Sequence, residues 1–398
     1  MINGNLLLGT VAVLAVGTTL LSMIALAWAA RPRRRLPDFL PPVSILKPLK
    51  GIDEGLEENL RSFFQLDYPE YQLLFGVTDS LDAAIPVVER LMLEFPERDA
   101  RLIVGPTGYG LNPKVENMAA LYPQRRHDVI VISDSNVKAR PNYLRETVPL
   151  LGEPGVGLVT NLIAGTEESS LGAVLENLQL NGFIAGGMAS ASALGITCVV
   201  GKSMVMPARV LDEVGGFAGV RNILAEDQVL GLKVRRAGYK VRLSPHVIAN
   251  VNRSRGLKWF LNRHSRWYKI RRRMAPIPFA MEPLVSLGVV GLVWALSGDS
   301  GIAWSGLLVL ASVGMVRDAL QTRWLRGTWP KPRHLLLSPV KDLFLLPVWF
   351  DALVSDRIHW RGHYRRVGRL TRLRLTRMPR AVRRRMRRIN RLRYRQQP

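Results

Sequence analysis

The residues best suited to chemistry fall in four polar clusters in the middle of the chain. The first contains Asp79 and Asp82, whose carboxylates could accept hydrogen bonds from a nucleoside base or ribose; capping of the next helix is the alternative for Asp82. The second cluster is Asp134, Ser135 and Asn136. A carboxylate with a nearby oxygen ligand suits Mg²⁺ or Mn²⁺ that gains further ligands from a substrate diphosphate, although ordinary turns contain the same residues.

The third cluster pairs Glu226 with Asp227. A carboxylate here could act as a general base that takes the proton from an attacking hydroxyl, and complementing a helix dipole is the structural alternative. The fourth cluster contains Arg263, Arg266 and Trp267. Their spacings of three and four residues place them on one face of a helix, where they could close over a diphosphate. A basic amphipathic helix at a membrane surface has the same pattern.

The elements that must position these clusters are those of an α/β domain. Short apolar runs rich in β-forming residues alternate with amphipathic stretches, which predicts a largely parallel sheet covered by helices on both faces. The predicted strands are 43–49, 71–77, 102–104, 128–133 and 156–160, and two of the predicted helices are 226–236 and 257–273. Ligands of such sheets bind at the carboxyl ends of the strands, where the first two clusters lie.

An uncharged apolar run at residues 6–30 is long enough to cross a bilayer as a helix. Arg31, Arg33, Arg34 and Arg35 follow it directly, and the run lacks a basic segment ahead of it. This pattern indicates an uncleaved anchor rather than a signal peptide. By the positive-inside rule, the N-terminus lies outside and the domain that follows is cytoplasmic.

The chain turns apolar again after the α/β domain. Residues 283–297 and 302–316, joined by a turn at 298–301, predict a transmembrane hairpin. A third apolar stretch at 335–354 contains charged residues and prolines. Its composition favours a re-entrant or interfacial segment over a plain span.

The formal net charge of +25 predicts a polyanionic partner. Seventeen Arg and no Lys, Asp or Glu occur in residues 357–397, so about two thirds of the excess charge lies in a C-terminal tail. Such a tail could bind RNA, DNA or anionic lipid headgroups. Because other segments predict membrane insertion, we expect anionic membrane lipids as its partner and no nucleic acid.

The predicted organisation has four parts. Residues 1–41 form an anchor with its basic flank, 42–276 the cytoplasmic α/β domain, 277–356 the hairpin with the re-entrant or interfacial segment, and 357–398 the Arg-rich cytoplasmic tail. The single cysteine, Cys198, excludes an intramolecular disulfide and fits a domain in the reducing cytosol. We expect it to be a packed residue.

Taken in this order, the clusters resemble the ceramide glucosyltransferase family, within the GT-A glycosyltransferases. The resemblance covers about residues 43–274 and is carried by the stretches VSILKPLKGIDEGLEENLRSFFQLDYPEY, GLNPKVENM, ISDSNV, AEDQVLG and RHSRW. It implies a GT-A domain with transmembrane helices that moves a sugar, usually glucose, from a UDP-sugar to a lipid hydroxyl with inversion. We expect a multi-pass protein of the cell inner membrane.

The same resemblance assigns the carboxylates to roles. Asp79 and Asp82 fall in the family's first aspartate region, and Asp134 resembles the second aspartate, which is associated with the metal and the diphosphate. With Asn136, Asp134 is the expected ligand of Mg²⁺ or Mn²⁺. Asp227 resembles the third aspartate, the catalytic base.

The remaining expected contacts are to the donor. Arg263, Arg266 and Trp267 match the family's RxxRW element, and Lys114 and Asn117 in the GLNPKVENM stretch are candidate donor-binding residues.

Several alternatives stay open at the level of sequence. Ceramide is the expected acceptor, and diacylglycerol or a hopanoid are the alternatives; hopanoid-linked relatives share these motifs and would transfer glucosamine or N-acetylglucosamine. A processive polysaccharide synthase uses similar motifs but needs a bundle of helices around a polymer channel. A non-enzymatic basic protein that binds membranes or nucleic acid would have no reason to carry all four clusters.

Overall fold

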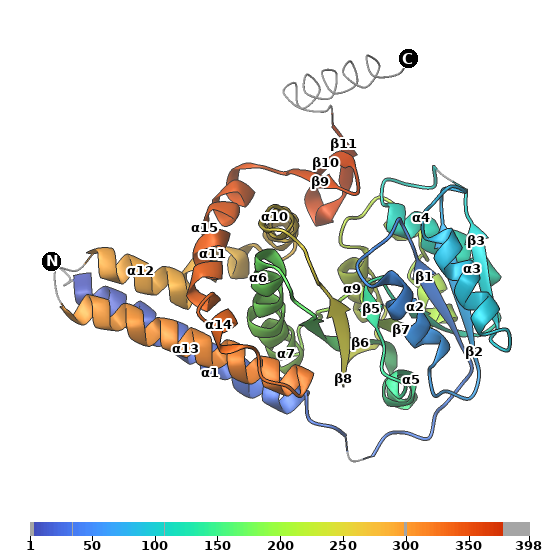
Figure 1. Ribbon diagram of the computed structural model, residues 1–398, viewed down its shortest axis with the longest axis horizontal. Helices are drawn as coiled ribbons and strands as arrows, with labels where there is room; N and C mark the ends of the chain where they lie inside the picture. Colours follow the sequence, from blue (N-terminus) through green and yellow to red (C-terminus); the bar gives the residue numbers. More distant parts are fainter. Residues whose placement is uncertain (1–3, 34, 107, 298–300, 377–398) are drawn as a thin grey trace.

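The computed structural model describes residues 4–33, 35–106, 108–297 and 301–376, and Figure 1 shows an α/β part beside a group of long helices. An eight-stranded sheet forms the centre of the α/β part, in the order β3-β2-β1-β4-β7-β6-β8-β5. Its strands are β1 (Val43–Pro48), β2 (Tyr71–Val77), β3 (Ala100–Val104), β4 (Val129–Ile132), β5 (Val137–Lys138), β6 (Val156–Thr166), β7 (Met204–Pro207) and β8 (Lys240–Val251).

Most pairings in this sheet are parallel. Strand β1 pairs in parallel with β2 and β4, β2 with β3, and β6 with β8. Strand β7 is antiparallel to both of its neighbours, and the short β5 is antiparallel to β8. The expected α/β fold with a mostly parallel sheet is therefore confirmed. All five predicted strands are present, and β6 continues past its predicted end to Thr166.

Helices cover both faces of the sheet because successive side chains of a strand point to opposite sides. Ile45 packs into one core and its neighbour Leu46 into the other. The helices on the face of Ile45 are α2 (Leu56–Phe64), α3 (Ile85–Glu94) and α5 (Tyr143–Thr147). Those on the face of Leu46 are α4 (Pro113–Leu121), α8 (Ala208–Glu213) and α9 (Glu226–Arg236).

A second group of helices leads from the sheet to the apolar part of the chain. Helix α6 (Leu171–Gln179) continues through a π-helical turn at Leu180–Ile184 into α7 (Ala185–Ala193). Helix α10 (Leu257–Met274) packs against α6 and α15 (Ser338–Val354) through a cluster that includes Leu175, Phe260 and Leu345. The remaining α-helices are α1 (Gly4–Ala29), α11 (Pro276–Val285), α12 (Leu287–Ser297), α13 (Gly301–Arg326), α14 (Pro332–Leu335) and α15 (Ser338–Val354). Four short 3₁₀ turns are at Tyr122–Gln124, Val148–Gly152, Ala218–Val220 and Arg369–Thr371.

Two of the described helices, α1 and α13, are long and apolar enough to cross a membrane, and the pair α11–α12, bent by 54°, makes a third if it is one span. In Figure 1, α1, α12 and α13 lie side by side and extend from one end of the protein. Helices α12 and α13 correspond to the hairpin predicted from the sequence, and the turn expected between them falls mostly on residues 298–300, outside the described residues.

Charged residues in the third apolar stretch have partners. Lys341 on α15 is fully buried, and its Nζ lies 3.2 Å from an oxygen of Asp318 on α13 and 3.1 Å from Asp342. Asp318 also pairs with Arg317 at 2.8 Å. Pairing offsets the cost of burying these charges and fixes α15 against α13.

The first residues of the predicted tail are folded. Strands β9 (Arg357–Trp360), β10 (His363–Val367) and β11 (Leu373–Leu375) form a second, antiparallel sheet in the order β11-β10-β9. Figure 1 shows this C-terminal sheet between α10 and the strand ends of the α/β part. Residues 377–398 of the tail lie outside the described residues.

A close approach between α6 and the chain entering α10 generates a prediction about stability. A Cβ at Gly172 would lie 2.4 Å from the backbone of Arg255 and of Gly256. Gly172→Ala should therefore push α6 away from α10 and cost about 1–3 kcal/mol, which differential scanning fluorimetry in detergent would detect as a lower Tm. The matched control is Gly187→Ala in α7, where nothing lies within 4 Å of the added carbon. Equal Tm values for the two variants would contradict this packing.

Candidate active site

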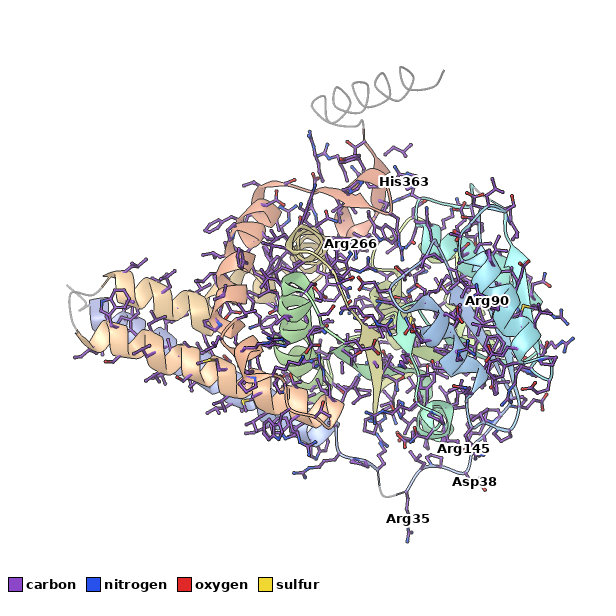
Figure 2. The ribbon with its side chains drawn as sticks, in the orientation of Figure 1. Arg35, Asp38, Arg90, Arg145, Arg266 and His363 are labelled. Carbon is purple, nitrogen blue, oxygen red and sulfur yellow. The ribbon has the colours of Figure 1, made fainter. Side chains whose placement is uncertain are left out.

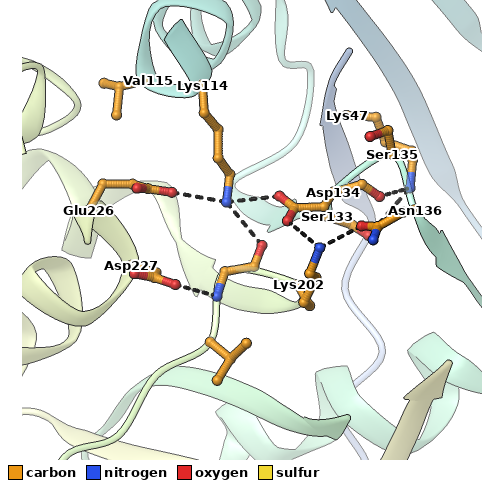
Figure 3. Close-up of polar contacts among 12 residues, drawn as sticks. Lys47, Lys114, Val115, Ser133, Asp134, Ser135, Asn136, Lys202, Glu226 and Asp227 are labelled. Atoms are coloured by element: carbon orange, nitrogen blue, oxygen red, sulfur yellow. Dashed lines mark hydrogen bonds and ion pairs between the residues drawn. The ribbon is translucent and has the colours of Figure 1, made fainter. Parts of the chain in front are cut away.

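Lys114 holds the centre of the candidate site. Its ammonium group lies 2.8 Å from an oxygen of Asp134, which follows β4, and 2.9 Å from an oxygen of Glu226, in the first turn of α9. It also donates to the carbonyl of Gly201 at 3.1 Å. Figure 3 shows Lys114 reaching between the two carboxylates. The structure thus brings together the second and third clusters of the sequence.

The cap of α4 explains why Lys114 points this way. The Asn112 side chain accepts hydrogen bonds from the backbone N–H of Lys114 and Val115. Its amide nitrogen donates to Glu226 at 3.1 Å, so one side chain joins the starts of α4 and α9. Asn117, one turn later, donates to the carbonyl of Leu49 at the end of β1. Asn117 therefore supports the backbone of the site rather than facing the Lys114 cluster.

Lys202 is a second cation at Asp134. Its Nζ lies 2.9 Å from Asp134 Oδ2 and 2.5 Å from Asn136 Oδ1. Burial alone would raise the pKa of Asp134, but Lys114 and Lys202 hold the pKa far below its usual range. Asp134 is consequently ionised at any physiological pH.

The two expected metal ligands converge on one point. Asp134 and Asn136 both direct an oxygen at the Lys202 ammonium, so this cation occupies the space between them. No group of three or more His, Cys, Asp or Glu side chains in the described part of the chain could hold a metal ion. A divalent cation here would have the oxygens of Asp134 and Asn136 as protein ligands, would compete with Lys202 for them, and would need its other ligands from water and a substrate diphosphate.

Asp227 is a partly buried carboxylate at the start of α9. Its Oδ2 accepts from the N–H of Gly201 at 2.7 Å, and its Oδ1 accepts from the N–H of Gln228 at 2.8 Å. Burial and the neighbouring Glu226 charge raise the pKa of Asp227 to about 6, against the opposing effect of Lys114. A carboxylate with this pKa is ionised at neutral pH and still basic enough to accept a proton.

The first aspartate region does not join the Lys114 cluster in the described residues. Asp82 accepts from the N–H of Gly51 and of Ala84, and so ties the loop after β1 to the start of α3. Asp79 is exposed and accepts from the N–H of Leu81. Asp82 thus closes a turn ahead of α3, whose N-cap is Ala84 and has no side-chain hydrogen bond, and Asp79 has the more accessible carboxylate.

In the fourth cluster, Arg263 is held in place by a buried carboxylate that the sequence analysis did not identify. Glu176 on α6 is fully buried and lies 3.0 Å from Arg263 Nε and 2.9 Å from His264 Nε2. The Arg263 guanidinium also lies between the rings of Trp259 and Trp267, at 5.1 and 4.6 Å from their centroids. Arg263 and Trp267 thus form one packed unit on the face of α10.

Arg266 has no carboxylate partner in the described residues, as is also true of Lys258 and Arg272 on the same helix. It lies over the ring of Trp360 in β9, at 5.6 Å. Burial and the nearby Arg263 and Arg361 lower the pKa of Arg266 to about 10, which means that an anion would be stabilised beside it. Figure 2 labels Arg266 beside α10, close to the C-terminal sheet.

The C-terminal sheet and its turns contact two loops that border the candidate site. Arg361, in the turn after β9, donates to the carbonyl of Lys50 at 3.3 Å and lies 3.5 Å from Asp53. The hydroxyl of Thr371 accepts from the N–H of Ala225, and the carbonyl of Thr371 accepts from the N–H of Leu224. These bonds fix the backbone directly ahead of Glu226 and Asp227.

Comparison with known proteins identifies the family. Residues 7–373 match the sequence pattern of glycosyl transferase family 21. The chain belongs to this family. Ceramide glucosyltransferase 3 of Caenorhabditis elegans is 30% identical over 333 residues, which are 81% of this chain and 72% of that protein. Ceramide glucosyltransferase 1 of the same organism is 32% identical over 257 residues, which are 64% of this chain and 55% of that relative. The resemblance seen in the motifs is thereby confirmed.

A solved structure supports the fold of this glycosyltransferase. The mannosyltransferase from Pyrobaculum calidifontis, in complex with GDP-Man and Mn²⁺, superposes with a TM-score of 0.50 over 87% of this chain and 99% of that chain, at 16% identity. Similarity at this level shows a shared GT-A-like fold.

Several side chains of the glycosyltransferase site were absent from the sequence analysis. They are Lys47, Lys202, Glu176 and Arg361. Lys47 is fully buried, and its Nζ donates to Ser133 Oγ and to the Asp134 carbonyl while lying 3.4 Å from the centre of the Phe63 ring. The GKS stretch around Lys202 carries no signal that would have singled it out.

The position of Arg361 generates a prediction about anion binding. Arg361→Gln removes a cation next to the unpaired Arg266, so it should weaken the binding of inorganic pyrophosphate to the purified full-length protein by up to about fivefold. Isothermal titration calorimetry would measure the change. Arg369→Gln is the control, since Arg369 is exposed in the turn between β10 and β11 and its side chain has no acceptor among the described residues. Equal losses in both variants, or none in either, would contradict a role for Arg361.

Proposed function

We propose that this glycosyltransferase moves a sugar, most simply glucose, from a UDP-sugar to the hydroxyl group of a membrane lipid, with inversion at the anomeric carbon. The names of the relatives, ceramide glucosyltransferases, support ceramide as the acceptor. The observation that carries the proposal is Asp227: a carboxylate with a pKa raised to about 6 lies beside Lys114, and the same Lys114 and Lys202 form ion pairs with Asp134.

In the proposed reaction Asp227 takes the proton of the acceptor hydroxyl as its oxygen attacks the anomeric carbon. The new carbon–oxygen bond forms on the face opposite the bond to the diphosphate, which breaks and leaves UDP. A single base and a direct displacement invert the configuration. Asp227 then returns its proton to solvent.

The cations of the site have the task of neutralising the leaving group. Lys114, Lys202 and Arg266 come from three different elements and would contact the diphosphate, while Arg263 and Trp267 hold the face of α10. Asp79 is our candidate for the residue that contacts the nucleoside of the donor. Asp82 and Asn117 would hold the neighbouring loops in place. A divalent cation at Asp134 and Asn136 would add positive charge to the departing diphosphate.

The membrane arrangement follows from the acceptor. A lipid keeps its tails in the bilayer, so the enzyme must present its site at the interface. We propose a multi-pass protein of the inner membrane with the 42–276 domain in the cytoplasm, held there by the anchor, the hairpin and the Arg-rich tail on anionic lipids. The described residues contain two helices able to span, or three with the bent pair, which is few for a polymer channel.

A substrate panel tests the reaction. Transfer of labelled sugar from UDP-glucose, UDP-galactose and UDP-N-acetylglucosamine to ceramide, diacylglycerol and hopanoid acceptors should give one labelled lipid product, with UDP-glucose and ceramide as the expected pair. Asp227→Asn should lower the rate by about 10²–10⁴-fold, because the base is lost. Asp38→Asn, an exposed carboxylate on the linker, is the control and should keep full activity. A fully active Asp227→Asn protein would refute the assignment of the base.

The pH dependence tests the protonation state of Asp227. The reaction needs the ionised carboxylate, so kcat/KM should rise about tenfold per pH unit below pH 6 and level off above it. Because the Glu226 charge helps to raise this pKa, Glu226→Gln should move the acid limb to lower pH. An acid limb that stays in place or moves to higher pH in Glu226→Gln would contradict the electrostatic role of Glu226.

A further inference from the structure

A basic cavity of about 790 Å³ lies away from the Lys114 cluster, at the end of the N-terminal helix. Its walls are the last turn of α1, the linker that follows, the end of α7 with residues 195–198, and the start of β8. Figure 1 shows the linker passing below the sheet between α1 and β1. The cavity is thus placed where the chain leaves the candidate membrane helix.

The charges around this cavity are unbalanced. Arg31 and Arg33 approach from the linker, and Arg235, Lys240 and Arg242 come from the α/β part. Arg35 also lines the cavity, but its side chain extends away from the body in Figure 2. No carboxylate is among the lining residues in the described part of the chain.

A single neighbouring carboxylate serves two of these cations. Glu153 pairs with Arg33 and, at 2.7 Å, with Arg242. Lys240 Nζ donates only to the carbonyl of Pro154, at 3.0 Å. The side chains of Arg31 and Arg235 have no acceptor among the described residues. Glu153 therefore offsets part of the charge, while Arg31, Arg235 and Lys240 are left without a carboxylate, and an anion in the cavity would lower their mutual repulsion.

The other side of the cavity is apolar. Trp28 and Ala29 end α1, and Ala193 and Ile196 continue the surface. The side chains of Trp28 and Ile196 are 66% and 58% exposed, and the neighbouring Leu194 is 75% exposed. Aromatic side chains at the end of a spanning helix lie at the level of lipid headgroups.

We propose that this cavity binds the phosphate headgroup of an anionic phospholipid, with the glycerol and upper acyl chains against Trp28 and Ile196. A basic group near a membrane surface attracts such lipids at about 1 kcal/mol per Lys or Arg. This lipid site is separate from the site that binds the acceptor lipid. Its ligand is anionic, whereas the proposed acceptor, ceramide, is neutral.

A segment that lines the cavity is hydrogen-bonded to the candidate active site. The carbonyl of Thr197 accepts from Gln228 Nε2 at 2.8 Å, and the N–H of Val199 donates to Gln228 Oε1 at 2.9 Å. Gln228 follows Asp227, and Gly201 in the same segment donates to Asp227. A bound headgroup would therefore restrain residues 195–203, the segment that holds the candidate base.

The test uses the full-length protein in dodecyl maltoside micelles. Titration with dioleoylphosphatidylglycerol should raise Tm in a saturable manner, whereas dioleoylphosphatidylcholine should leave it unchanged. Arg235→Gln should weaken the apparent affinity for phosphatidylglycerol about fivefold, and the double variant Arg235→Gln/Lys240→Gln about thirtyfold. Hydrogen exchange in residues 195–203 should slow on addition of phosphatidylglycerol in the unaltered protein but not in the double variant.

Charge-matched variants provide the control. Arg236 follows Arg235 on α9 but does not line the cavity, and Arg209 is exposed on α8. Arg209→Gln/Arg236→Gln removes the same charge and should keep the affinity of the unaltered protein. Equal affinities in both double variants would overturn the proposal, because binding would then reflect overall charge or the tail. An equal rise in Tm with inorganic phosphate would overturn the assignment to a lipid.

Discussion

The ammonium group of Lys114, placed between Asp134 and Glu226, is the interaction on which the arrangement of this glycosyltransferase depends. Three carboxylates come close together at the ends of strands and the start of a helix, where water can no longer screen their repulsion. Lys114 and Lys202 supply the opposite charge, and the Asn112 cap orients Lys114. Without these cations the carboxylates would be buried unpaired, and removing one partner of a buried ion pair typically costs about 3–5 kcal/mol.

Much of the fold could be predicted from the sequence, because local pattern determines it. Strand β2 and helix α9 begin and end at their predicted residues, and α10 is longer by one residue. Strand β8 was not among the predicted strands: its alternating pattern is typical of a strand, but Pro245 interrupts it, and the strand continues past that point because it pairs with β6 across a register shift. The C-terminal sheet was not predicted either. Its strand β10 reads HYRRV, and such an Arg-rich composition indicates a tail unless the pairing with β9 is known.

The candidate site also contains residues that local sequence motifs reveal and residues that are recognised only by contacts distant in sequence. Asp134, Lys114 and Asp227 could be found because each stands in a recognisable stretch at the end of a strand or the start of a helix. Lys202 and Glu176 act through residues more than 60 positions away, and a lone charged residue has no local signature for such a contact. Asp82 and Asn117 occupy motif positions, but their side chains form hydrogen bonds with backbone groups. These contacts are visible only in the three-dimensional structure.

The C-terminal sheet has a consequence for the order of events during biosynthesis. Thr371 and Leu373 supply the hydrogen bonds that fix the segment before Asp227, yet they are translated after every helix of the apolar part. The nascent α/β domain therefore leaves the ribosome with an unfinished catalytic centre. Completion waits until α11 to α15, which include candidate membrane helices, have been made, so the candidate site is assembled only after these helices have been synthesised.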